Sequence, residues 1–130
     1  MTDKELNLRI VENLLIIPDE LREAEIILGN AKLKENELKA QLSDAEFDAE
    51  INAIIDGKNA EERKRQLKQA ISESSVVQLV ANELMAQEAE IITIEANVKA
   101  ISRNFRANLA LAELQAARLN LMAKYPKQNK

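Results

Sequence analysis

Residues 24–50 read AEIILGNAKLKENELKAQLSDAEFDAE, and apolar side chains recur in this stretch at alternating spacings of three and four residues. The same spacing extends in both directions, from Ile10 to Ala49, and only Glu35 is polar. A seam sustained over roughly five heptads is typical of a long helix that packs along another helix. The seam positions are Ile10, Leu14, Ile17, Leu21, Ala24, Leu28, Ala31, Glu35, Leu38, Leu42, Ala45 and Ala49.

A second apolar stripe recurs every seven residues in the same arm. Its members are Ile26, Leu33, Ala40, Phe47 and Ile54. Because helical residues advance by about 100°, this stripe lies about 140° around the helix from the seam. One hairpin partner can cover only one of the two stripes, so the sequence predicts that the chain associates with itself. The alternative is a single wide apolar stripe within a monomeric bundle.

A turn is predicted after the first arm. Gly57 suits the left-handed position that often follows a helix end. Asn59 is then a candidate N-cap, and Glu62 completes a capping-box pattern. The expected boundaries are a first arm at about residues 3–55, a turn at 56–59, a second helix at about 60–124 and a frayed tail at 125–130, all within one domain of 130 residues.

Two residues interrupt the first arm without changing the phase of its seam. Pro18 either starts a new helix or kinks a continuous one, and the sequence does not separate these alternatives. Gly29 weakens any helix but is expected to be tolerated here.

The second helix carries its own heptad seam, which predicts that it pairs with the first arm as an antiparallel hairpin. Apolar residues recur every seven positions at Val77, Leu84, Ile91, Val98, Phe105, Ala112 and Leu119. The alternate positions include polar Gln87, Asn108 and Gln115, which can fix the register of a seam. Upstream, the phase slips within SESS at residues 72–75, where a kink or stammer is expected. The predicted fold class is therefore all-α: a long antiparallel helical hairpin with coiled-coil heptads that assembles into a homo-oligomer.

The composition argues against an enzyme. The chain has no histidine and no cysteine, and no glycine-rich phosphate loop is present. These absences remove the commonest general base and the usual transition-metal ligands, so no catalytic residue, cofactor or metal site is predicted. No apolar run reaches the ~18–20 residues needed to cross a bilayer, and no signal-peptide pattern is present. We therefore expect a cytoplasmic protein without a membrane partner.

Basic side chains gather in an otherwise acidic chain, which holds 18 basic against 22 acidic residues. The first cluster consists of Lys58, Arg63, Lys64, Arg65 and Lys68, and the second of Lys99, Arg103 and Arg106. They are candidates for contact with a polyanion. The alternative is a solvated face that pairs with Glu61, Glu62 and the acidic first arm. Phe105 lies on the seam and is expected in the core rather than stacked on a base.

The order of these features resembles a known family. Residues 62–108 read ERKRQLKQAISESSVVQLVANELMAQEAEIITIEANVKAISRNFRAN, in which a basic helix start, a polar interruption, a long aliphatic seam and a basic segment with an embedded phenylalanine follow one another. This order is similar to that of the UvsY-type recombination mediators of tailed phages. The resemblance covers about residues 61–108.

The resemblance implies a small helical homo-oligomer that binds single-stranded DNA, displaces a single-strand-binding protein and helps load a recombinase in a phage or mobile element. A phage-encoded member would act in the host cytoplasm. The family's basic and aromatic element precedes its hairpin turn, whereas the matching stretch here, DAEINAIID at residues 48–56, is acidic and aliphatic. DNA contacts are therefore expected at this chain's own two basic clusters. The competing hypothesis is a coiled-coil scaffold or nuclease inhibitor that contacts proteins and binds no DNA.

Overall fold

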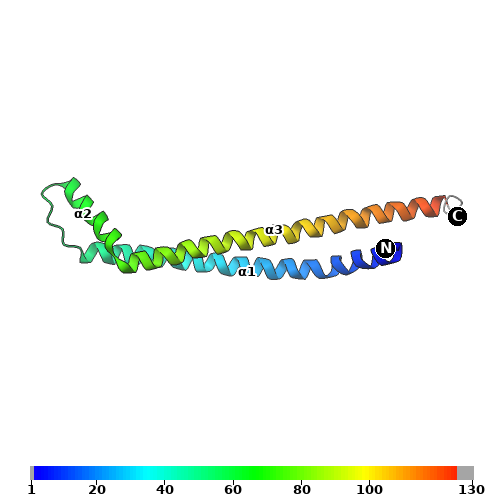
Figure 1. Ribbon diagram of the computed structural model, residues 1–130, viewed down its shortest axis with the longest axis horizontal. Helices are drawn as coiled ribbons and strands as arrows, with labels where there is room; N and C mark the ends of the chain where they lie inside the picture. The colour runs from blue at the N-terminus through cyan, green and yellow to red at the C-terminus, as the bar shows by residue number, and fades with distance from the viewer. Residues whose placement is uncertain (1, 126–130) are drawn as a thin grey trace. The chain divides into compact units, whose positions relative to one another are not determined.

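The computed structural model describes residues 2–125, and these residues form three α-helices (Figure 1). Helix α1 spans Asp3–Asn52, α2 spans Ala60–Glu73 and α3 spans Ser75–Lys124. No strand occurs in this part of the chain, so the all-α class predicted from the sequence is confirmed. The predicted tail lies outside the described residues, except for Tyr125.

Contacts within the chain gather in two units that share α1 and α3. Residues 1–27 and 94–130 form one unit, which we call the terminal unit, and residues 28–93 form the other, which we call the turn unit. This grouping is finer than the single domain expected over residues 1–130. Each unit is described by itself below.

In the terminal unit, the first part of α1 runs antiparallel to the second part of α3. An ion pair joins Asp3 to Arg118 at 2.8 Å, and Asn7 accepts a hydrogen bond from Gln115 at 3.1 Å. Further along, Asn13 donates to Asn108 at 3.0 Å. Residue numbers rise on one helix as they fall on the other, which defines the antiparallel register.

In the turn unit, the second part of α1 lies beside the first part of α3, and α2 connects them (Figure 1). The buried apolar residues of this unit are Ala31, Leu38, Ala45, Val77 and Ile91. Gln87 of α3 is also buried, and its side-chain amide donates to the backbone carbonyl of Ala31 at 3.0 Å.

The seam positions of α1 form its contact face in both units. All of them are buried or half-buried, whereas the residues between them are mostly exposed. Among the predicted core residues, Leu38, Val77 and Ile91 are buried, and the half-buried ones are Leu21, Leu28, Leu42, Leu84, Val98 and Phe105. The exception on α3 is Leu119, which is 45% exposed. Its neighbour Arg118 pairs with Asp3, the first residue of α1, so Leu119 lies near the end of the contact between the two helices.

The first arm is one helix that passes through Pro18 and Gly29, and no new helix starts at the proline. Pro18 removes one intrahelical hydrogen bond, but Ile17 before it is buried in the seam and holds the helix against α3. The arm ends at Asn52 rather than near residue 55. There the Asn52 side chain donates back to the carbonyl of Asp48 at 2.9 Å, and the N–H of Ala53 donates to the carbonyl of Glu50, one of the last carbonyls of α1, at 3.3 Å.

The expectation of one continuous helix over residues 60–124 is wrong, because Ser74 separates α2 from α3. Ser74 adopts an extended backbone with φ −68° and ψ 119°, and its N–H donates to the carbonyl of Ile71 at 3.2 Å. Its hydroxyl then accepts the N–H of Val77 at 3.3 Å. One serine therefore ends α2 and caps α3, within the segment where the seam changes phase.

Three polar residues lie buried on the seam of α3, and each finds a partner. Gln87 and Gln115 bond to α1 as described above, and Asn108 accepts from Asn13 while donating to the carbonyl of Asn104 at 2.8 Å. Among the described residues, no buried side-chain nitrogen or oxygen lacks a hydrogen bond. A one-heptad slip would break these bonds, so they favour the observed register.

We predict that Asn13→Ala lowers the free energy of unfolding by about 1–3 kcal/mol, because it leaves the buried amide oxygen of Asn108 without its donor. Urea unfolding followed by circular dichroism measures this change. The double variant with Asn108→Ala should lose less than the two single losses added together. Strict additivity would show that this bond does not contribute to stability.

Candidate nucleic-acid interface

The first basic cluster begins in a turn that side chains fix at both ends. Asn59 has an extended backbone, and its side-chain oxygen accepts the N–H of Glu62 at 2.8 Å. Glu62 in return accepts the N–H of Lys58 at 3.2 Å. This arrangement is a capping box shifted by one residue, because the reciprocal bond reaches Lys58 instead of Asn59. It starts α2 at Ala60 and sets the direction in which the basic side chains leave the helix.

Gln66 holds the other side of this turn. Its side-chain oxygen accepts the N–H groups of Asp56 and Gly57, at 3.2 and 3.0 Å, and its amide donates to the Asp56 carboxylate at 2.7 Å. The role of Gln66 was not predicted from the sequence. Glutamine carries both a donor and acceptors and can bridge backbone and carboxylate, but nothing in the local spacing identifies a bond across nine or ten residues.

Gly57 is needed here for space and not for a left-handed backbone, which corrects the expectation from the sequence. No glycine among the described residues has a positive φ angle. A Cβ atom on Gly57 would lie 2.9 Å from the backbone nitrogen of Arg63 and 3.1 Å from the side-chain oxygen of Gln66. The loop passes so close to the start of α2 that a side chain does not fit.

The two glycines should therefore respond in opposite directions to alanine. Gly57→Ala should destabilise the turn, because its Cβ would meet backbone that cannot rotate away. Gly29→Ala should stabilise the protein by about 0.5–1 kcal/mol, because Gly29 lies inside α1 with nothing within 4 Å of its missing Cβ. Thermal unfolding of both variants gives the comparison, and a stabilising Gly57→Ala would contradict the close approach described above.

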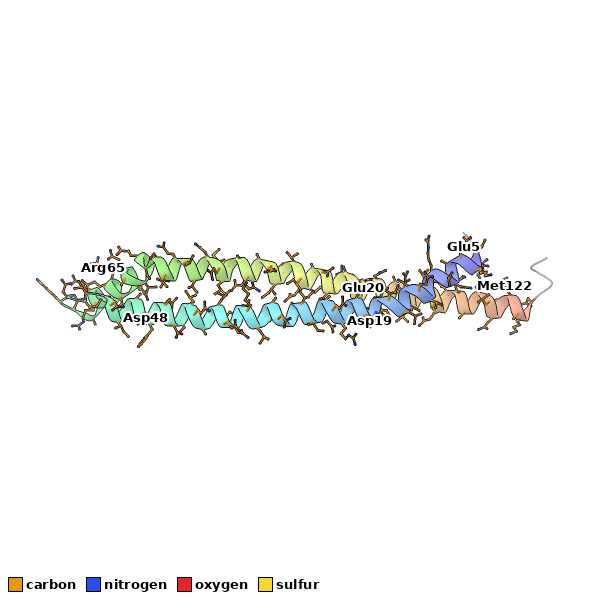
Figure 2. All side chains as sticks on the ribbon, turned by 90° about the horizontal axis from the view of Figure 1, so that it is seen from below. Glu5, Asp19, Glu20, Asp48, Arg65 and Met122 are labelled. Carbon is orange, nitrogen blue, oxygen red and sulfur yellow. The ribbon has the colours of Figure 1, made fainter. Side chains whose placement is uncertain are left out.

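All five basic residues of the first cluster are exposed: Lys58, Arg63, Lys64, Arg65 and Lys68. Among residues 2–125, no ion pair involves any of them. Lys64 and Lys68 are four residues apart on α2. Arg65, which is labelled in Figure 2, lies beside them in projection at about 100° per residue. Arg63 lies about 140° from Lys68 by the same geometry, on the side where its Cγ approaches Gly57. The sequence suggested a common face of Arg63, Lys64 and Lys68 flanked by Arg65, but this geometry groups Lys64, Arg65 and Lys68, with Arg63 at the margin beside the turn.

The neighbouring carboxylates do not neutralise this cluster equally. Glu62 is half-buried and already accepts the N–H of Lys58, so its charge is directed to the turn. Glu61 is exposed on the same outward side as Lys64 and Lys68. An anion that docks on α2 would meet three cations and one carboxylate on this side.

The second cluster lies on α3 in the terminal unit. Lys99, Arg103 and Arg106 are all exposed, and the described residues show no ion pair at any of them. Phe105 beside them is half-buried on the seam, so its ring is not freely available as a stacking platform. The two clusters belong to different units and are treated as two separate surfaces.

A hollow of about 380 Å³ lies in the turn unit between the end of α1, α2 and the start of α3. Alanines and acidic or neutral polar residues line it, including Asp48, Asn52, Glu73 and Ser74. The side chains of Asn52 and Ser74 are already bonded to backbone. With no basic lining residue, the hollow does not suit an anion.

Residues 2–125 offer no metal or membrane-spanning site. No group of three or more acidic residues there is arranged to hold a metal ion. None of the three described helices contains a stretch long and apolar enough to cross a bilayer. Comparison of the chain with protein-family models, with curated proteins and with solved structures gives no significant match.

Proposed function

We propose that the protein is a self-associating, non-enzymatic accessory protein that binds single-stranded DNA and helps to load a recombinase. The observation that carries this proposal is the cluster of exposed, unpaired basic side chains at the start of α2. The resemblance over about residues 61–108 supplies the recombination context, including exchange with a single-strand-binding protein. The proposed ligand is the phosphate backbone, since the cluster offers charge and no exposed aromatic ring.

The charge of one chain limits its affinity. The net charge is −4, and Glu61 faces the same side as the cations, so a single cluster binds a strand weakly. Self-association repeats the cluster, and a strand that contacts several copies gains affinity through effective concentration. Exposed apolar residues in both units support self-association, among them Leu15, Leu33 and Phe47.

A salt titration of oligonucleotide binding tests the proposal. Labelled single-stranded DNA should bind at low salt with little sequence bias, and more tightly than a duplex of the same length. The logarithm of the affinity should fall with the logarithm of the salt concentration at about −0.7 per phosphate contacted. Absence of binding even at ~50 mM salt would contradict the proposal, since electrostatic contacts are strongest at low ionic strength.

The same outcome would favour the second candidate function, a helical protein–protein module or nuclease inhibitor. The exposed apolar residues of α1 and α3 support it independently of DNA. The acidic residues of α1 would then contact a basic surface of the partner protein.

A further inference from the structure

The outer side of α1 in the turn unit carries a second seam. Leu33, Asn36, Ala40, Ser43 and Phe47 follow one another at alternating spacings of three and four residues, and all five are exposed. Leu33 is 62% exposed and Phe47 is 61% exposed. This seam, which we call the outer face, is separated by about half a helical turn from the seam that packs on α3.

We infer that the outer face is an interface for a second copy of this chain, docked antiparallel about a twofold axis at Ala40. The inference deepens the self-association in the proposed function and depends on it. In this arrangement Leu33 meets Phe47 of the second copy and Ala40 meets itself, while Asn36 and Ser43 of the second copy lie within one residue of each other along the helix axis, a rise of about 1.5 Å. A twofold interface is self-complementary in this way, because residue i contacts j while j contacts i.

The sizes of the side chains fit this arrangement. The two large apolar residues lie at the ends of the face, about 21 Å apart at 1.5 Å per residue. The three residues between them are smaller and let the helix axes approach closely. Asn36 and Ser43 each carry donors and acceptors, so they can bond to each other across the axis.

The charges along α1 select the antiparallel direction. Residues 30–39 hold lysines and acids together, namely Lys32, Lys34 and Lys39 with Glu35 and Glu37. Residues 40–52 hold acids and no base, namely Asp44, Glu46, Asp48 and Glu50. A parallel pair would place the two acidic halves against each other, whereas an antiparallel pair places each acidic half beside the lysines of the other copy.

The exposed surface is large enough to supply an interface with a partner. The chain exposes 9995 Å². A compact monomer of 14.6 kDa exposes roughly 6,900 Å² from the usual scaling with mass. The difference of roughly 3,000 Å² exceeds the ~800 Å² per partner that a standard stable interface buries. The outer face supplies apolar residues for such an interface from one continuous helix.

Cysteine cross-linking tests the direction and the axis together, because the native chain has no cysteine. Ala40→Cys should form a disulfide-linked dimer under mild oxidation, since the two copies of residue 40 meet at the axis. Leu33→Cys mixed with Phe47→Cys should form a mixed dimer, while neither alone should cross-link well. Asn82→Cys, exposed on the outer side of α3, is the matched control and should stay largely unlinked.

A charge substitution measures the strength of the same interface. Phe47→Glu should raise the dissociation constant of the assembly on the order of 30-fold or more, as expected when a charge replaces a large aromatic anchor that packs against Leu33 of the second copy. Ile92→Glu, at 69% exposure on α3, should leave it within a few-fold of the parent. Sedimentation or light scattering at micromolar concentration gives both values.

Three results would overturn the inference: a parent that is monomeric at micromolar concentration, self-linking of Leu33→Cys in place of the mixed product, or equal losses from Phe47→Glu and Ile92→Glu. The parent's oligonucleotide binding is measured separately. If cross-linking fails while DNA still binds with the expected salt dependence, the interface is wrong and the proposed function stands. If the dimer forms and no DNA binds, the proposed function is wrong and the interface stands.

Discussion

The triple variant Arg63→Ala, Lys64→Ala, Arg65→Ala should weaken binding of single-stranded DNA on the order of 100-fold at ~0.1 M salt. The estimate follows from counterion release: three lost phosphate contacts at about 0.7 each reduce the salt slope by about 2, which corresponds to two decades at this salt concentration. All three residues are exposed and make no ion pair among the described residues. Their removal should therefore leave helicity and assembly mass unchanged, and a fluorescence titration over several salt concentrations measures the effect.

A matched triple variant separates a local contact from a general loss of positive charge. Lys99→Ala, Arg103→Ala, Arg106→Ala removes the same charge from exposed positions on α3 in the terminal unit. It should weaken binding clearly less if α2 is the principal contact. Equal losses would mean that net charge controls binding, and parent-like binding of the first triple variant would show that the α2 cluster is only a solvated face.

Most of the helical architecture could be predicted because its signals are local. The seam from Ile10 to Ala49 identifies the buried face of α1 through spacing alone, and the polar residues at Gln87, Asn108 and Gln115 were identified as seam positions before their partners were known. Heptad spacing follows from the geometry of the helix itself, so it does not depend on the rest of the fold.

The details that were wrong or missed depend on contacts between residues distant in sequence. Gly57 was assigned a left-handed backbone, but the crowding that requires glycine comes from Arg63 and Gln66. Leu119 satisfies the heptad pattern but is 45% exposed, near the end of the contact between α1 and α3. Neither effect has a signature in the local spacing.

The interruption at Ser74 was predicted in part: its position was found from the sequence, but its form was not. The sequence located the change of phase within residues 72–75 and predicted a kink or stammer there, whereas the helix is interrupted at Ser74. The outcome depends on one side chain, because the Ser74 hydroxyl caps α3 while its N–H still bonds to α2. Serine can compete with helical backbone bonds in this way. The spacing of residues around Ser74 does not determine whether the helix stays continuous with a kink or ends and starts again.

Leu38→Ala should lower the free energy of unfolding by about 2–5 kcal/mol, the largest stability loss expected from one side chain in the turn unit. Leu38 is only 5% exposed, and its neighbours along the seam, Ala31 and Ala45, are small. Alanines cannot fill the space that a missing leucine leaves, so the variant loses both transfer free energy and packing contacts. Leu28, which is half-buried on the same seam, should lose less when changed to alanine.

Leu79→Ala is the matched control for this prediction, because Leu79 lies on α3 in the same unit and is 60% exposed. Its loss should stay within about 0.5 kcal/mol, as for most surface substitutions. Urea unfolding at a single chain concentration is required, since self-association adds to the apparent stability. The prediction depends on one difference between the two leucines: Leu38 is buried in the seam and Leu79 is exposed. Equal losses of unfolding free energy from the two substitutions would therefore mean that α1 does not pack through the seam. A loss of unfolding free energy confined to Leu38→Ala would show that packing of the heptad seam, rather than of the outer face, stabilises the single folded chain.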